Sequence, residues 1–169
     1  MKADTPVKGV ANLRIRDMKS QGKTYETLLI GERIEESKTV ERRDVFSYLG
    51  LADDLNPLFS QSVYAERTEF EQVVVPPSLL VNWFSALVSM KLPGPGSLVQ
   101  SMQFDFPAPL FIQDEVVLML EISDKLDHDK KVKLVAKGMS GDKIVAEGEL
   151  VVCPPRPLKP LFKDAFENF

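Results

Sequence analysis

The chain has 169 residues, 44% hydrophobic and 27% charged, which is typical of one globular domain. A net charge of -4 without a long basic run argues against nucleic acid or an anionic membrane as a partner. A single cysteine, Cys153, excludes a disulfide framework within the chain, and His128 is the only histidine. We therefore expect no metal site and no cofactor. Because the first ten residues lack the apolar core of a signal peptide, we expect a cytoplasmic protein.

The N-terminal third predicts an extension followed by a strand and two helices. Residues 1–22 are mixed in character and predict an extension with at most a brief strand at 12–15. Weak alternation predicts a strand at 32–40, and apolar residues sharing one face predict a helix at 41–51. After a loop that ends at Pro57, we expect Ser60 to cap a short helix that continues to Glu66.

The most apolar stretch is the predicted helix at 78–92. Pro76 and Pro77 can open it, since proline at the first helical position sacrifices only an N–H without a helical partner. The sequence PGPG at 93–96 ends it. Small polar side chains lie on one stripe of its surface, at Ser78, Asn82, Ser85 and Ser89. A helix this apolar must be covered by other elements.

The C-terminal half predicts four strands that could cover the helix. They are expected at 98–106, 115–125, 130–137 and 143–152. Alternation places Ile144, Ala146, Gly148 and Leu150 on one face of the last strand. Ser140-Gly141-Asp142 predicts a hairpin turn before it. One buried helix with an antiparallel sheet around it describes an α+β hotdog fold.

These elements predict a domain at 23–154 between an extension at 1–22 and a tail at 155–169. The tail is rich in proline and then amphipathic, with Leu161, Phe162, Phe166 and Phe169. We expect it to lie on the surface of this domain or of a partner. A single hotdog sheet leaves an open edge that must be paired or covered. We therefore expect a dimer.

Three motifs in this order resemble the MaoC-like family of (R)-specific enoyl-CoA hydratases and 3-hydroxyacyl dehydratases. DLNPL at 54–58 resembles the D-x-N-P-x opening of its hydratase motif. LPGPG at 92–96 resembles the loop after its central helix, and FDFPAP at 104–109 with Asp114 resembles its F-x-x-P-V-x-x-G-D segment. The resemblance covers residues 39–154 and implies a hotdog fold and an acyl-CoA or acyl-carrier thioester as ligand.

The resemblance also implies a set of catalytic positions, which this chain fills only in part. The family uses an aspartate, a histidine five residues later, a glycine N–H after another histidine, and a helical serine. Here these positions hold Asp54, Phe59, Pro77 and Ser85. Phenylalanine cannot transfer a proton, and proline has no N–H to stabilise an oxyanion. The sequence therefore predicts impaired hydration, with Asp54 as the candidate catalytic residue.

The remaining candidate residues have simpler structural explanations as well. Asn56, Phe59, Pro77, Ser85 and Trp83 are candidates for substrate binding. Asn56 is also a common turn former, Phe59 and Trp83 fit a core, and Asp54 can hold loop amides.

The sequence leaves three functions open. The first is a degenerate MaoC-like protein that binds acyl thioesters, as a homodimer or as the non-catalytic half of a heteromer with an active sibling. The second is a hotdog thioesterase that uses Asp54 as its base. The third is a purely structural or regulatory hotdog.

Overall fold

A computed structural model describes residues 21–158 of the chain. The strand predicted at 12–15 and the amphipathic tail beyond Leu158 lie outside these residues. The described part contains a 3-10 turn, one five-stranded sheet and four α-helices. No helix within it is long and apolar enough to cross a membrane.

The elements follow the predicted order along the chain. A 3-10 turn, η2 (Tyr25–Thr27), precedes β1 (Arg33–Thr39) and α2 (Arg42–Ala52). Two short helices, α3 (Pro57–Ser60) and α4 (Ser62–Ala65), precede the long α5 (Pro77–Met90). The other strands are β2 (Leu98–Asp105), β3 (Glu115–Leu126), β4 (Lys131–Ser140) and β5 (Lys143–Cys153).

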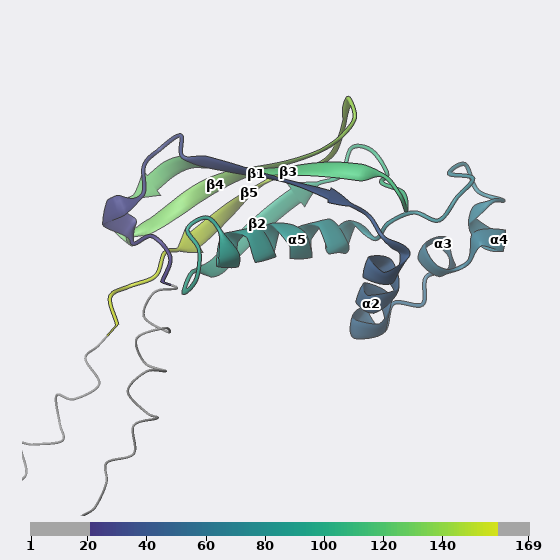
Figure 1. Cartoon of the computed structure of the whole chain (residues 1–169), viewed down its shortest axis with the longest axis horizontal. Coiled ribbons are helices and arrows are strands. Elements are labelled where there is room, and N and C mark those ends of the chain that lie inside the picture. The colour runs from purple at the N-terminus through teal and green to yellow at the C-terminus, as the bar shows by residue number, and fades with distance from the viewer. Residues whose placement is uncertain (1–20, 159–169) are drawn as a thin grey trace, which may run out of the picture.

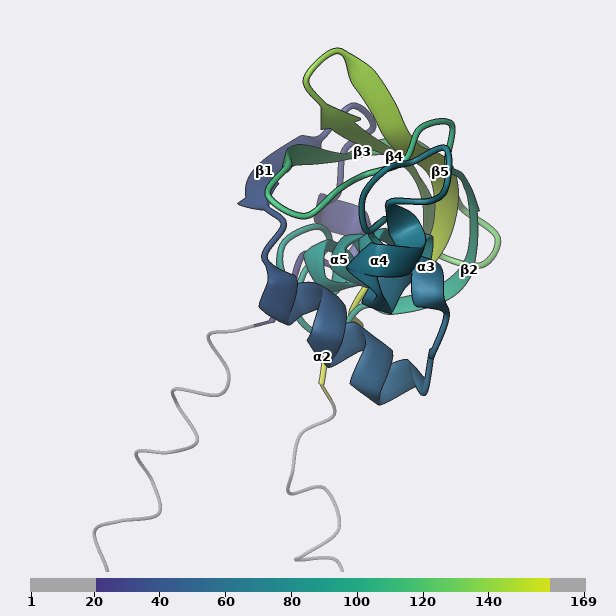
Figure 2. The ribbon, with the colours of Figure 1, turned by 90° about the vertical axis from the view of Figure 1, so that its right-hand side faces the viewer.

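The sheet is antiparallel throughout, with the strand order β1-β3-β4-β5-β2. It lies along one side of α5, while α2, α3 and α4 gather at one end (Figure 1). The view from that end shows the strands curling around α5 (Figure 2). This is the hotdog fold, and the prediction of an α+β domain is confirmed.

The core lies between α5 and the concave face of the sheet. Phe84 of α5 is fully buried, in one hydrophobic core with the buried side chains that alternate along β3 and β4 as predicted. The Phe84 ring stacks on the Phe104 ring of β2, with 5.1 Å between the ring centroids. The Phe104 ring in turn stacks on the Phe106 ring, with 6.2 Å between the ring centroids. Phe104 lies opposite Gly148 in the β2–β5 register, so the aromatic ring covers a strand position that has no side chain.

Two details of the predicted elements are wrong. Ser60 does not cap the second short helix. It is the last residue of α3, whose N-cap is Asn56, because Pro57 takes the first helical position. Ile144 does not share the face of Ala146. A β-bulge lies where Gly138 pairs with Ala146 and Met139 with Ile144. The intervening Val145 is buried together with Ala146, whereas Ile144 is only half-buried.

The segment before β1 is hydrogen-bonded to the loop that follows α5 and to the β3–β4 turn. The Gly22 and Lys23 N–H groups donate to the carbonyls of Pro95 and Pro93, each at 2.8 Å. The buried Tyr25 hydroxyl donates to Asp127 at 2.7 Å. Burial, followed by this bond and the negative charge of Asp127, raises the pKa of Tyr25 from 10.0 to about 12.

We expect the Tyr25 bond to stabilise the fold in neutral solution and to lose its effect in alkali. Because the folded pKa lies above the unfolded one, unfolding releases the phenol proton once the pH exceeds about 10. The difference in free energy of unfolding between wild type and Tyr25→Phe should therefore be largest below pH 10 and shrink as the pH rises towards 12. Urea unfolding of both proteins across this range measures it, and a difference that does not depend on pH would contradict it.

Candidate functional site

An apolar cavity in the described part of the chain has a volume of about 380 Å³. It lies between α3, the first turns of α5, the bulge of β5 and the segment that follows β2. All of its lining residues are apolar: Leu58, Phe59, Phe70, Val74, Val75, Pro77, Leu80, Phe106, Pro107, Ala108, Pro109, Leu110 and Val145. A cavity of this size and polarity is within the range of small-molecule sites.

Local hydrogen bonds fix the α3 wall of the cavity. The Asn56 side chain accepts from the Leu58 N–H at 3.0 Å and so begins the helix that presents Leu58 and Phe59. The Leu58 carbonyl accepts from the Val74 N–H at 3.2 Å. The Val75 N–H donates to the Leu110 carbonyl at 2.8 Å, which ties this wall to the segment after β2.

Asp54 lies in the turn between α2 and α3 and does not line the cavity. It is half-buried, and its carboxylate accepts a hydrogen bond from the Asn56 N–H at 3.0 Å. The preceding residue, Asp53, ends α2 in the left-handed conformation, which aspartate tolerates better than most residues. The two short side chains, Asp54 and Asn56, therefore make successive turns that carry the chain from α2 into α3.

Two successive prolines open α5 beside the cavity. Pro76 is the N-cap and Pro77, a lining residue, is the first helical residue. The Leu79 N–H already donates to the Pro76 carbonyl at 2.9 Å. The first turn of α5 therefore presents an apolar ring to the cavity where another residue would present an N–H.

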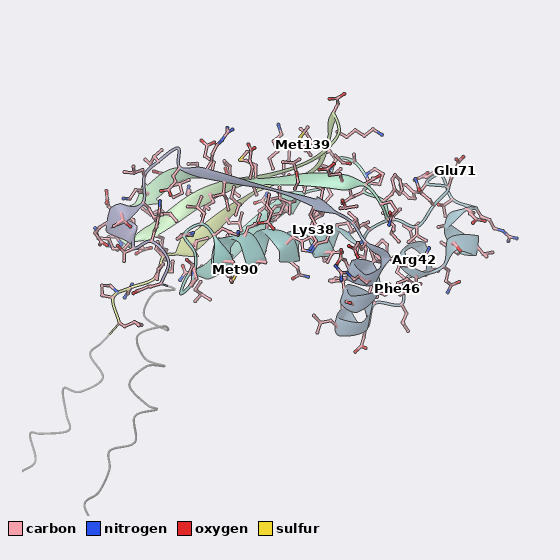
Figure 3. All side chains as sticks on the ribbon, viewed as in Figure 1. Lys38, Arg42, Phe46, Glu71, Met90 and Met139 are labelled. Atoms are coloured by element: carbon pink, nitrogen blue, oxygen red, sulfur yellow. The ribbon has the colours of Figure 1, made fainter. Side chains whose placement is uncertain are left out.

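Ser85 and Trp83 do not line the cavity. Ser85 is half-buried, and its carbonyl accepts from the Ser89 hydroxyl at 3.0 Å. Trp83 lines two smaller cavities of about 290 Å³ each, one on the β1 side of α5 and one on the α2 side. The ammonium group of Lys38, labelled in Figure 3, lies 4.7 Å from the Trp83 ring centroid. Of the six predicted site residues, only Phe59 and Pro77 meet in the cavity.

Several cavity residues were not predicted from the sequence. Phe106 to Pro109 stood out only as a motif, which carried no prediction of a cavity wall. Phe70 and Val145 gave no signal, since one comes from a loop and the other from a bulge. His128 lies fully exposed in the β3–β4 turn. No three His, Cys, Asp or Glu side chains gather as a metal site within residues 21–158.

Comparison with known proteins identifies the family. No protein-family model matches the chain. The (R)-specific enoyl-CoA hydratase of Aeromonas caviae is 31% identical over 132 residues, which are 77% of this chain and 98% of that protein. The chain is a MaoC-like hydratase-family member. The 3-hydroxybutyryl-CoA dehydratase of Methylorubrum extorquens is 27% identical over 78% of this chain and 84% of its own length.

Solved structures agree with the assignment to the MaoC-like family. The structure of the (R)-hydratase from A. caviae involved in PHA biosynthesis has a TM-score of 0.74 at 30% identity. It matches 77% of this chain and 99% of its own. An unliganded R-hydratase of Pseudomonas aeruginosa, 24% identical, has the same fold with a TM-score of 0.75 over 84% of this chain and 97% of its own.

Proposed function

We propose that this MaoC-like protein binds acyl-CoA or acyl-carrier thioesters, with the hydrocarbon chain in the 380 Å³ cavity, and hydrates 2-enoyl thioesters very slowly. One observation carries the proposal. The side chains that line the cavity are all apolar. They include Phe59 and Pro77, which stand at positions that the resemblance to the family's motif assigns to a proton-transfer group and an oxyanion donor. The cavity therefore suits an acyl chain, and neither the Phe59 nor the Pro77 side chain supplies proton transfer or an oxyanion donor.

The loss of chemistry follows from the side chains themselves. A positioned general acid or base commonly contributes about two to four orders of magnitude to a rate. One oxyanion-hole donor contributes about two to three orders of magnitude. Asp54 is the one remaining candidate base among the motif's positions. One oxygen of its carboxylate already accepts a hydrogen bond from the Asn56 N–H. A lone carboxylate without either partner supports only slow hydration.

Calorimetry with a saturated acyl-CoA tests binding separately from hydration. Ala108 lines the cavity and is half-buried, so Ala108→Phe should fill part of the space and weaken binding at least tenfold. Ala86→Phe is the matched control, because Ala86 is exposed on α5 and lines only the smaller cavity beside Trp83. Equal affinities for both variants would contradict the proposed site. Release of free CoA during the titration would favour the thioesterase instead.

The edges of the sheet indicate how the chain associates. The outer strand β1 carries four charged residues in seven, which protects that edge from pairing. The opposite edge, β2, reads LVQSMQFD, with one charge in eight and with Leu98 and Met102 exposed. An exposed edge with few charges can pair with a strand of another chain. We propose a homodimer that pairs two copies through β2.

Substitution at each edge tests the homodimer. Met102→Lys should bring two like charges close together at the paired strands and weaken the dimer at least tenfold. Ser37→Lys adds the same charge to β1 and should leave the dimer intact. Light scattering at micromolar concentration distinguishes the two. A monomeric wild type, or a dimer that both variants retain, would contradict pairing through β2.

A further inference from the structure

The cavity has a more exposed rim, which includes three phenyl rings, and a buried aliphatic floor. Phe59, Phe70 and Phe106 are partly exposed, and Phe106 is 36% accessible. The deeply buried lining residues are all aliphatic: Val74, Val75, Leu80, Leu110 and Val145. Val145 has the lowest exposure among them, at 1%. A ligand that enters past the phenyl rings therefore ends against this aliphatic floor.

Val145 reaches the floor only because of the bulge in β5. In a regular strand, neighbouring side chains point to opposite faces. Here Gly138 pairs with Ala146 and Met139 with Ile144, so Val145 has no partner on β4. Both Val145 and Ala146 are consequently buried, at 1% and 0%. Bulges redirect side chains in this way beside functional sites.

Gly138 of β4 lies beside the bulge. A β-carbon built on Gly138 would lie 3.5 Å from Val145 Cγ2 and 3.4 Å from the Ala146 Cβ. Val145 thus lies near Gly138 of the neighbouring strand and borders the cavity.

We propose that Val145 forms the closed end of the acyl site and sets the length of hydrocarbon chain that the protein accepts. This inference rests on the proposed function. The chemical class of the buried end follows from the lining, which offers no side-chain charge or hydrogen-bond donor to a polar group. The ligand therefore ends in an unsubstituted alkyl chain, with its thioester towards the rim.

A series of saturated acyl-CoA ligands of increasing chain length tests this role. Each methylene that becomes buried should lower Kd about fourfold, until the chain reaches Val145 and the trend stops. Val145→Ala should move this limit to a longer chain, and Val145→Ile should move it to a shorter one. Val132→Ala is the matched control, since Val132 is fully buried on β4 but does not line the cavity.

The outcomes separate this inference from the proposed function. A shift of the limit in opposite directions for the two Val145 variants, with none for Val132→Ala, supports it. Val145→Ile alone decides the matter if Val145→Ala does not fold. If wild type shows a length limit that neither Val145 variant moves, the inference fails while the acyl site stands. If wild type binds no member of the series, the proposed function fails as well.

Discussion

Gly148→Ala is expected to destabilise the fold by about 3 kcal/mol or more, as overpacking of a site without free space does. A β-carbon at this position would lie 2.1 Å from the Gln103 carbonyl oxygen and 2.8 Å from the Phe104 ring. The carbonyl belongs to the backbone of β2, so relief requires the strand itself to move. Such a movement would also shift Phe104, which stacks on Phe84 in the core and on Phe106 at the cavity rim.

Gly50→Ala provides the matched control for this prediction. Gly50 is exposed in α2, and nothing lies within 4 Å of a β-carbon built there. Since alanine is the better helix former, Gly50→Ala should stabilise the protein by about 0.5 to 1 kcal/mol. Urea unfolding of both variants measures the two effects. If Gly148→Ala is as stable as wild type, the pairing of β2 with β5 does not require a residue without a side chain at position 148.

The double variant Phe59→His with Pro77→Gly is expected to hydrate trans-2-enoyl-CoA at least about a hundredfold faster than wild type. The histidine supplies a group that transfers protons, and the glycine restores an N–H to the first turn of α5. Both positions line the same cavity, so the two groups would face one ligand. Loss of the enoyl absorbance with time measures the rate.

Asp54 is the control for the double variant. Adding Asp54→Asn keeps an oxygen that can accept the Asn56 N–H but removes the carboxylate. It should therefore abolish the gained activity while leaving the fold intact, which circular dichroism checks. A gain that survives Asp54→Asn would exclude Asp54 as the base. If the folded double variant hydrates the substrate no faster than wild type, groups other than these two must also limit hydration.

The fold could be predicted because its signals are local. Prolines and glycines bound a continuous apolar stretch, which predicted α5, and alternation predicted the buried faces of β3 and β4. The bulge at Val145 could not be predicted, since it depends on the register between β4 and β5. A strict alternation therefore placed Ile144 on the wrong face.

The site could be predicted only where a motif and the cavity coincide. Phe59 and Pro77 were found through the motif, and both line the cavity. Trp83 follows Leu80 by three residues on the same helix, yet it turns towards Lys38 of β1 while Leu80 lines the cavity. Phe70 approaches through a loop whose path depends on tertiary contacts, such as the pairing of Val74 with Phe111. Sequence spacing does not encode such contacts.

A calorimetric titration with trans-2-octenoyl-CoA tests most directly whether the protein binds acyl-CoA without hydrating it efficiently. Binding and turnover give different heat signals in the same experiment. We predict injection heats that saturate at one ligand per chain, with the baseline restored after each injection. A sustained heat of reaction would show that the protein is an efficient hydratase, and the absence of any heat change would show that the cavity does not bind acyl-CoA. Either result would contradict the account.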